Sequence, residues 1–407
     1  MHTARGRLRI AHVITRFIRG GADENTLLSC NAQAALGHDV TLFVGREYHE
    51  AMVARLSPQV QLEVLTHLVR PIHPIKDARC LLDLAYRLRA KRYDLVHTHE
   101  SKAGILGRIA ARLAAVPTIV HGVHILAHLN AGPAASWIYL AAERLAARLT
   151  HVFVSVSPAM REACLATGLG SPQAHLVVES GMDVARYANA SANTPAVEQS
   201  IAQLSPERPS IVLMASALEP RKRVLEFVEV FAKLAPRTPN ACLLIAGEGP
   251  LRRQLEALIA NLGLDGRIVC LGHREDLENF IARADVCVHA AASEGLPRVA
   301  VQYVAAGKPI VATALPGLDS LVVDGSNGAL VEAGNLEALA EPLHMLLSDE
   351  DARARACAFS RGMDVSAWSI GAMIAGLEEA YELAQQRSGT AAIRLDAERN
   401  PVLQAAP

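Results

Sequence analysis

The sequence predicts an α/β protein of two doubly wound, Rossmann-like domains that face each other across a cleft. The chain has 407 residues and 51% of them are hydrophobic, so it is long enough to form two cores of ordinary size. Short apolar runs alternate with helical patterns, which is typical of parallel βαβ units. One polar stretch with little hydrophobic periodicity, residues 188–210, divides this alternation into two series.

The first series predicts an N-terminal domain over residues 1–187. Apolar runs predict its strands, and patterns of helical period predict the helices between them. The expected strands are residues 9–14, 40–44, 62–65, 95–97, 118–121, 152–156 and 177–179. The expected helices are one that follows Gly20-Gly21 and ends near residue 36, and then residues 81–91, 103–114 and 136–148.

Residues 188–210 are expected to be a linker with one short helix, and the second series predicts a C-terminal domain over residues 211–365. Its expected strands are residues 211–214, 241–246, 268–271, 286–289 and 308–313, and its helices include 225–234, 254–262, 277–282 and 336–347. Residues 366–387 are expected to form a closing helix that packs back toward the N-terminal domain. Residues 388–407 carry weak signals and are expected to be a disordered tail.

Charge and cysteine content restrict the environment and the partners. The formal net charge is −1, so the overall charge indicates no nucleic-acid partner. Residues 1–190 carry 21 Lys and Arg against 14 Asp and Glu, a basic surplus that indicates either contact with an anionic surface or ordinary variation. Seven scattered cysteines without a CxxC motif, and no signal peptide or membrane span, predict a cytoplasmic protein whose only membrane contact is peripheral, at the inner face.

The most informative stretch runs from Glu294 to residue 313. Glu294 and Gly295 precede a helix that is expected to begin at Pro297 and to end near Gly307, with Gln302 on the helix itself. Free N–H groups at a helix start suit a phosphate, and a carboxylate beside an amide suits sugar hydroxyls. An ordinary buried helix between two strands is the alternative interpretation.

Several other segments place polar residues where strands are expected to end, which is where open parallel sheets bind ligands. Gly20 and Gly21 follow the first strand and would let backbone N–H groups approach a phosphate. His97 and His99 alternate on a strand and so point the same way. A third metal ligand is not evident, and we expect no metal site. His124 follows another strand, and it is either a cleft-facing imidazole or a structural histidine.

The order and spacing of these segments resemble the family 4 (group 1) retaining glycosyltransferases of the B-type fold, over about residues 8–385. The similarity is strongest to enzymes of polysaccharide and lipid-linked glycan synthesis. It is carried by segments that begin at Gly20, Gly37, Asp94, His121, Ser180, Ala217, Gly247, Gly272 and Glu294. The resemblance implies transfer of a sugar from a nucleotide-diphosphate donor, such as a UDP-sugar or GDP-sugar, to an acceptor hydroxyl, with no cofactor and no required metal.

The resemblance also implies roles for individual residues. Glu294, His124 and Lys222 would be catalytic, with Glu294 and His124 on the donor sugar and Lys222 on the diphosphate. The expected substrate-binding residues are Gly20, Gly21, Arg221, Gly295, Leu296 and Gln302. The acceptor would be a glycan or a lipid-linked glycan that meets the N-terminal domain. The helix that carries Trp137 either faces an anionic membrane or packs into the core.

Two positions depart from the family's pattern. Ala217 stands where the family has an arginine on the diphosphate, and we expect Arg221 or Arg223 to supply that charge. Gln302 stands where the family has a glutamate on the ribose, which would weaken donor binding by about 1 kcal/mol. These departures keep two other interpretations open: a weak or inactive nucleotide-sugar-binding or assembly subunit, and a sugar-nucleotide epimerase on the same double fold.

Overall fold

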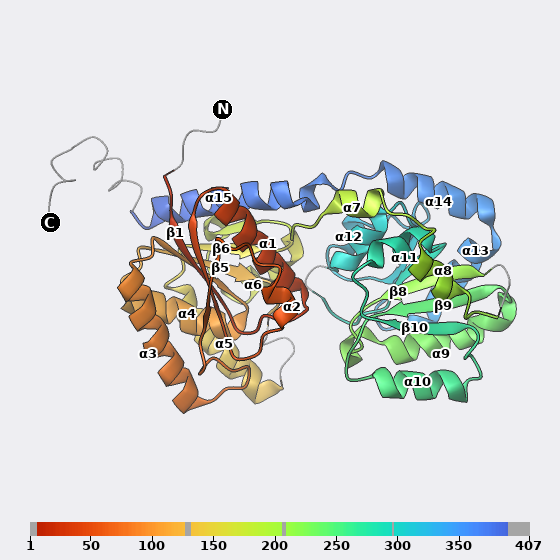
Figure 1. Cartoon of the computed structure of the whole chain (residues 1–407), viewed down its shortest axis with the longest axis horizontal. Coiled ribbons are helices and arrows are strands. Elements are labelled where there is room, and N and C mark those ends of the chain that lie inside the picture. Colours follow the sequence, from red (N-terminus) through yellow and green to blue (C-terminus); the bar gives the residue numbers. More distant parts are fainter. Residues whose placement is uncertain (1–5, 127–131, 206–208, 295–296, 390–407) are drawn as a thin grey trace. The chain divides into compact units, whose positions relative to one another are not determined.

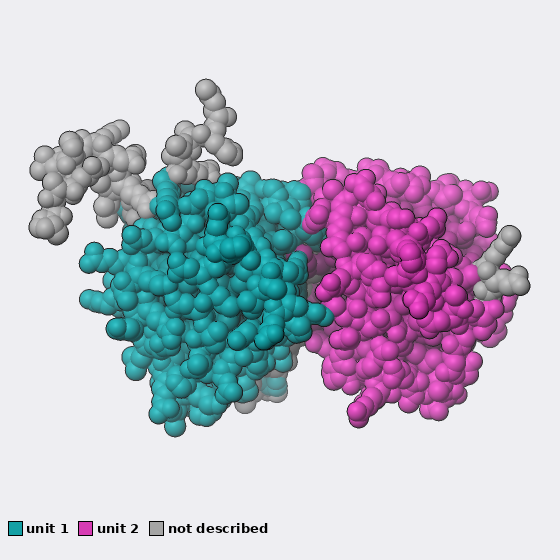
Figure 2. All heavy atoms as spheres, in the orientation of Figure 1, with its two compact units in different colours: residues 1–182, 369–407 teal, residues 183–368 magenta. Residues whose placement is uncertain are grey.

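The computed structural model describes residues 6–126, 132–205, 209–294 and 297–389. The chain divides into two compact units (Figure 2). Unit 1 comprises residues 1–182 and 369–407, and unit 2 comprises residues 183–368. Each unit is built on one parallel sheet, of seven strands in unit 1 and six in unit 2, which confirms the predicted doubly wound α/β class.

The sheet of unit 1 has the strand order β3-β2-β1-β4-β5-β6-β7, and each neighbouring pair of these strands is parallel. Its strands are β1 (Arg9–Ile14), β2 (Asp39–Val44), β3 (Gln61–Val64), β4 (Leu95–His99), β5 (Thr118–Val123), β6 (Val152–Ser155) and β7 (His175–Val177). Its helices are α1 (Gly21–Ala35), α2 (Glu50–Val53), α3 (Pro74–Lys91), α4 (Ser101–Leu113), α5 (Pro133–Ala147), α6 (Pro158–Ala166) and α15 (Ile370–Arg387) (Figure 1).

Side-chain alternation along the strands gives the sheet of unit 1 two apolar faces, and helices cover both. Ala11 and Val13 of β1 pack with the buried residues of α3 and α4. Ile10, one position earlier, packs with Met373 and Leu377 of α15. The closing helix α15 therefore belongs to the core of unit 1, although it is the last described helix of the chain.

Two elements of unit 1 are longer than the apolar pattern predicts. Helix α3 begins at Pro74, not near residue 81, because the His73 imidazole accepts a hydrogen bond from the N–H of Lys76 and Pro74 suits the first helical position. Strand β4 continues to His99, because His99 still pairs with Gly122 of β5. The residues at these two ends are mostly polar, so the hydrophobicity pattern did not predict either extension.

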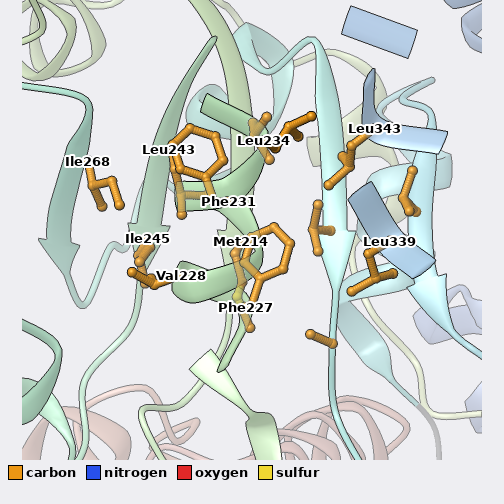
Figure 3. Close-up of a cluster of buried hydrophobic side chains, with 14 of the residues drawn as sticks. Met214, Phe227, Val228, Phe231, Leu234, Leu243, Ile245, Ile268, Leu339 and Leu343 are labelled. Atoms are coloured by element: carbon orange, nitrogen blue, oxygen red, sulfur yellow. The ribbon is translucent and has the colours of Figure 1, made fainter. Parts of the chain in front are cut away.

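The sheet of unit 2 has the strand order β10-β9-β8-β11-β12-β13. Its strands are β8 (Ser210–Ala215), β9 (Ala241–Ala246), β10 (Ile268–Gly272), β11 (Val286–His289), β12 (Ile310–Thr313) and β13 (Gly328–Val331). Its helices are α7 (Val184–Ala188), α8 (Pro195–Ile201), α9 (Val224–Leu234), α10 (Arg252–Asn261), α11 (Leu277–Arg283), α12 (Arg298–Ala305), α13 (Ala340–Ser348) and α14 (Glu350–Gly362). Phe227 and Phe231 of α9 pack on Met214 of β8 in its core (Figure 3).

The polar stretch 188–210 carries α8 and packs as part of unit 2. Helix α8 contacts α11, and α7, which precedes the stretch, contacts both α11 and α12. Val197 is fully buried, and the Thr194 hydroxyl caps the N-terminus of α8. The chain passes from one unit to the other twice, near Met182 and near Ser369. These two residues form an isolated parallel β-bridge. Residues 390–407 of the expected tail lie outside the described residues.

Tyr303 gives unit 2 a testable polar contact in its core. Its side chain is fully buried, and its hydroxyl oxygen accepts a hydrogen bond from the N–H of Ala215 at 2.8 Å. The substitution Tyr303→Phe should lower the free energy of unfolding of unit 2 by about 1–2 kcal/mol, because it leaves a buried N–H without its acceptor. Urea unfolding followed by Trp368 fluorescence, in a Trp137→Phe background, measures this. An unchanged midpoint would show that the N–H finds another partner.

Candidate active site

A cluster of charged side chains lies where β8 and β11 end in unit 2. The carboxylate oxygen Oε1 of Glu294 is in an ion pair with the Lys222 ammonium. Nη1 of Arg221 lies 3.7 Å from the same oxygen, and Nε2 of His289 lies 3.5 Å from it. One carboxylate oxygen therefore has three basic groups around it, and two of them were predicted as site residues together with Glu294.

The loops that carry these groups are joined through their backbones. The Arg221 carbonyl oxygen accepts a hydrogen bond from the N–H of Ala292 at 2.8 Å, which connects the loop after β8 to the loop after β11. Arg223 adopts a left-handed backbone conformation with φ of 53° and donates its guanidinium to the carbonyl of Ala333. Of the two arginines expected to compensate for Ala217, Arg221 therefore lies at Glu294, and Arg223 is turned to Ala333.

Burial changes the charge state of the cluster. Burial lowers the pKa of Lys222 to about 7, with a further lowering from the neighbouring Arg221 charge. Burial also lowers the pKa of His289 to about 3, helped by the charges of Lys222 and Arg221, so His289 stays neutral near neutral pH. The burial of Lys222 therefore opposes its charge, and its ion pair with Glu294 favours that charge.

Helix α12 follows Glu294 as the sequence predicts. Glu294 lies before the helix and Gln302 on it, and the first helical residue is Arg298, with Pro297 at the N-cap. The Gln302 side chain is half-buried, and no hydrogen bond joins it to another described residue. The predicted contacts at Gly295 and Leu296 lie outside the described residues.

The glycine loop of unit 1, at Gly20 and Gly21, lies against the buried carboxyl group of Asp23. Gly20 is the N-cap of α1 and Gly21 is its first residue, so the loop lies at a helix N-terminus as expected. Asp23 lies against this loop, and a Cβ on Gly20 would lie 2.8 Å from the Asp23 Oδ2. Burial raises the pKa of Asp23 to about 8, with a smaller contribution from Glu100, while Arg16 and the N–H groups of Ile18 and Gly20 oppose the shift.

Glu100, between β4 and α4, has a strained backbone. Its φ of 58° and ψ of 177° fall in a region that glycine favours, which costs about 1–3 kcal/mol for another residue. Burial raises the pKa of its carboxyl, and the charges of Arg16 and Arg70 lower it. The sequence analysis missed both Asp23 and Glu100, because neither has a spacing signal.

The histidines at the strand ends of unit 1 form one cluster. His12 lies opposite His97 in the register of β1 and β4. Ring nitrogens of His12, His97 and His99 all lie within 4.8 Å of one another. His124 joins them through its Nε2, which lies 3.1 Å from the His99 Nδ1. His12 is therefore the third imidazole that the sequence analysis lacked, and its place in the first strand opposite β4 was the available signal.

The structure brings together only part of the predicted site. Lys222, Arg221 and Glu294 meet in unit 2. His124 lies in unit 1 at the end of β5, in the same unit as the glycine loop. His289 is the further member of the unit 2 cluster that the sequence analysis missed, since a lone histidine in an apolar strand gives no signal.

Two parallel-stranded units with polar clusters at the carboxyl ends of their strands define a protein of the GT-B glycosyltransferase type. Residues 20–180 match the glycosyl transferase 4-like domain, and residues 197–361 match the glycosyl transferases group 1. The chain belongs to the group 1 glycosyltransferases.

Known proteins similar to the chain agree with this. The UDP-Gal:alpha-D-GlcNAc-diphosphoundecaprenol alpha-1,3-galactosyltransferase of Escherichia coli is 28% identical over 355 residues, which cover 86% of this chain and 90% of the relative. The structure of Anabaena Alr3699/HepE in complex with UDP and glucose has a TM-score of 0.77 at 22% identity, covering 92% of this chain and 99% of the other. WaaG, a glycosyltransferase involved in lipopolysaccharide biosynthesis, has a TM-score of 0.69 at 18% identity, with 89% and 98% covered.

Asp23 should make the stability of unit 1 depend on pH. Its folded pKa of about 8 lies above the ordinary value of 3.8, so the folded state keeps a proton that the unfolded chain releases between these values. Stability should therefore fall as pH rises through this window, by up to about 1.4 kcal/mol per pH unit. Urea unfolding followed by circular dichroism at several pH values measures the slope.

The substitution Asp23→Asn should remove that part of the slope. Glu24→Gln, at the next position of α1, is the matched control, because the Glu24 carboxylate forms a surface ion pair with Arg55. An Asp23→Asn slope equal to that of the parent protein would contradict the raised pKa.

Proposed function

We propose that the protein transfers a sugar, with retention, from a nucleotide-diphosphate donor to a hydroxyl of a lipid-linked glycan in bacterial-type polysaccharide or glycolipid synthesis. The cluster of Lys222, Arg221 and Glu294 carries the proposal. A UDP-sugar is the favoured donor, because the Escherichia coli relative is named for UDP-Gal and the Anabaena structure holds UDP.

The charge state of Lys222 suits a diphosphate. Lys222 and Arg221 would turn from Glu294 to the phosphate oxygens, and a pKa near 7 would rise when the diphosphate arrives. Glu294 would then be released to accept hydrogen bonds from sugar hydroxyls. The cation that balances the leaving group would thus move from Glu294 to the diphosphate when the donor binds.

The reaction would break the bond between the anomeric carbon and the donor phosphate oxygen, which leaves with the electron pair. The acceptor oxygen would bond to the same face of the anomeric carbon, and its proton would pass to the departing phosphate oxygen. Lys222, Arg221 and the N–H groups at the start of α12 would stabilise the developing negative charge. Glu294 and His124 would hold the sugar.

Binding of UDP and UDP-sugars tests the donor site by calorimetry. Lys222→Met should weaken UDP binding by about tenfold or more, because a charge-assisted hydrogen bond is lost. Gln302→Glu should tighten UDP binding by about fivefold, because a charged acceptor for the ribose is restored. At pH 8 the parent protein should take up protons on binding UDP, and Lys222→Met should take up fewer.

The arginine pair supplies a matched control. Arg221→Gln should weaken UDP binding, whereas Arg223→Gln should not, because the Arg223 guanidinium bonds to the carbonyl of Ala333. If neither the parent protein nor Gln302→Glu binds any UDP-, GDP- or ADP-sugar, the donor site is refuted. Donor binding without transfer would favour a nucleotide-sugar-binding subunit, and conversion of the donor without an acceptor would favour an epimerase.

The face of unit 1 formed by α3, α4 and α5, called here the α3–α5 surface, suits an anionic membrane (Figure 1). Helix α4 contacts both α3 and α5. Seven of the fifteen exposed large hydrophobic side chains in the described parts of the chain lie on these helices. They are Ile75, Leu82, Tyr86, Leu113, Trp137, Ile138 and Leu145. Trp137 is 73% exposed, so the interpretation of its helix as core packing fails for this side chain.

The exposed charges of the α3–α5 surface are mostly positive. Exposed arginines on or next to its helices include Arg79, Arg89, Arg112, Arg144 and Arg148. The three acids of these helices are each buried or half-buried and paired: Asp77 with Lys102, Asp83 with Arg87, and Glu143 with Arg108. Apolar side chains beside exposed cations are the pattern of a peripheral membrane surface. No helix in the described part of the chain is long and apolar enough to cross a membrane.

Sedimentation with lipid vesicles tests this surface. The protein should bind vesicles rich in phosphatidylglycerol and not vesicles of phosphatidylcholine, and binding should fall with salt. Leu82→Ser or Trp137→Ser should each weaken binding by about tenfold, from the lost burial of one large side chain. Phe359→Ser, at an exposed position of α14 in unit 2, is the matched control. Equal binding by all variants would refute the α3–α5 surface.

A further inference from the structure

Three buried histidines meet on the face of unit 1 that α1 and α15 cover. His12 lies on β1, His97 and His99 lie on β4, and each side chain is 2% exposed or less. Each ring offers one nitrogen that lies within 4.8 Å of a nitrogen of both other rings. The sequence analysis expected no metal site because a third ligand was not evident. The register of β1 and β4, which places His12 opposite His97, supplies that third imidazole.

Two of the rings face each other through their nitrogens. Nδ1 of His12 lies 2.9 Å from Nε2 of His99, and the two nitrogens share one hydrogen there. Two nitrogen ligands of one tetrahedral Zn²⁺ ion lie about 3.3 Å apart, because each Zn–N bond is about 2.0–2.1 Å long. A small outward shift of the rings would therefore let both nitrogens bind one ion. The shared hydrogen would then pass to Nδ1 of His99 or to solvent.

His97 adds a ring nitrogen that is buried and unpaired. Its Nδ1 lies 2.8 Å from the Tyr381 hydroxyl, whereas its Nε2 has no hydrogen-bond partner among the described residues. A hydroxyl can donate or accept, so His97 can carry its hydrogen on Nδ1 and keep a lone pair on Nε2. A buried polar atom without a partner costs free energy, which a metal ion bound to this nitrogen would offset. The unpaired nitrogen is thus a second, independent indication of a ligand.

A small cavity adjoins the rings. It is lined by His97, His99 and Gly122 and by apolar side chains that include Val154 and Met373, and its volume is about 10 Å³. That is about the room that one water molecule needs, and a Zn²⁺ ion is no larger. A Cβ on Gly122 would lie 3.1 Å from both Nε2 of His97 and Nδ1 of His99, so the glycine keeps this space open. The described residues that line the cavity include no carboxylate, which disfavours Mg²⁺ and Ca²⁺.

Neighbouring groups hold the rings in the manner of a second coordination shell. A histidine that binds a metal through one nitrogen generally donates its other ring N–H to a nearby acceptor. Nε2 of His12 lies 2.7 Å from the amide oxygen of Gln33, which can only accept. The Gln33 amide nitrogen donates to the Tyr381 hydroxyl oxygen at 2.9 Å, and that hydroxyl in turn holds His97. One amide of α1 and one hydroxyl of α15 thus orient two of the three rings.

We propose that His12, His97 and His99 bind one divalent transition-metal ion such as Zn²⁺, which fastens β1 to β4 inside unit 1. Imidazole nitrogens suit Zn²⁺, and three protein ligands with a water in the fourth position are an established arrangement for it. Because the rings are buried, we assign the ion a structural role. The proposal therefore goes beyond the proposed function and does not depend on it.

Metal binding is measured on the full-length protein without a histidine tag. After treatment with a chelator, calorimetric titration with Zn²⁺ alone should show one tight site, and zinc analysis after dialysis should find about one ion per chain. X-ray absorption at the zinc edge should show nitrogen ligands at about 2.0–2.1 Å and no sulfur. The absence of sulfur separates this site from binding by the seven free cysteines.

His97→Gln removes one ligand and should weaken Zn²⁺ binding by about 100-fold or more, because changes in the second shell alone weaken metal binding by about 10- to 100-fold. His121→Gln is the matched control and should bind Zn²⁺ like the parent protein. His121 is buried in the same sheet, but it lies against Gly104 of α4, and its Nδ1 lies 2.9 Å from Oγ1 of Thr98. Gln33→Leu keeps all three ligands and should weaken binding by about 10- to 100-fold.

Thermal unfolding gives a readout that needs only the parent protein. At a free Zn²⁺ concentration of about 100 times the Kd, the melting temperature of unit 1 should rise by about 5–10 °C, because the ion binds the folded state. His121→Gln should show the same rise and His97→Gln a much smaller one at the same Zn²⁺ concentration. If His97→Gln does not fold, the parent protein's titration, absorption spectrum and melting shift still decide the proposal.

Three results would overturn the proposal. One is a parent protein that binds no Zn²⁺ and gains no stability from it. Another is equal Zn²⁺ binding by the parent protein and His97→Gln, which would place the ion elsewhere. The third is a zinc-edge spectrum with sulfur ligands, which would assign the ion to cysteines.

Discussion

The parallel register of β1, β4 and β5 is the constraint on which the functional face of unit 1 depends. It places His12 opposite His97 and His99 opposite Gly122, and alternation turns all four toward the side covered by α1 and α15. A shift of one residue in any of these strands would send its side chains to the α3–α4 side. The row of imidazoles, and the reach of Gln33 and Tyr381 to it, therefore follow from strand pairing.

The two units accommodate their buried polar groups in different ways. Unit 1 keeps the imidazoles of His12, His97 and His99 neutral and joins them to neighbouring groups by directional hydrogen bonds, although Nε2 of His97 is buried without a partner. Unit 2 gathers charges around Glu294 and buries Lys222 with them, which lowers the pKa of that lysine to about 7. The first arrangement fixes the orientation of the rings, and the second concentrates charge at the strand ends of unit 2.

Much of the fold could be predicted from the sequence, because apolar runs mark buried parallel strands on both faces. The ends of elements were less certain, since His73 caps α3 and His99 ends β4 without an apolar signal. The sequence predicted a linker over residues 188–210, because α8 buries few side chains besides that of Val197. Of the site, Lys222, Arg221 and Glu294 do meet, while the roles given to them, to Gln302 and to His124 stay predictions.

The sequence by itself determined the βα series, the turn positions and the family motifs, because these depend on residues that are neighbours along the chain. Only the tertiary structure decided which of the candidate arginines lies at Glu294. It also decided that His289 belongs to the charged cluster of unit 2 and that His12 belongs to the histidine cluster of unit 1. It also decided that Tyr381, far along the chain, reaches His97. Such contacts join residues separated by tens to hundreds of positions, and strand order and helix packing set them, so no local pattern contains them.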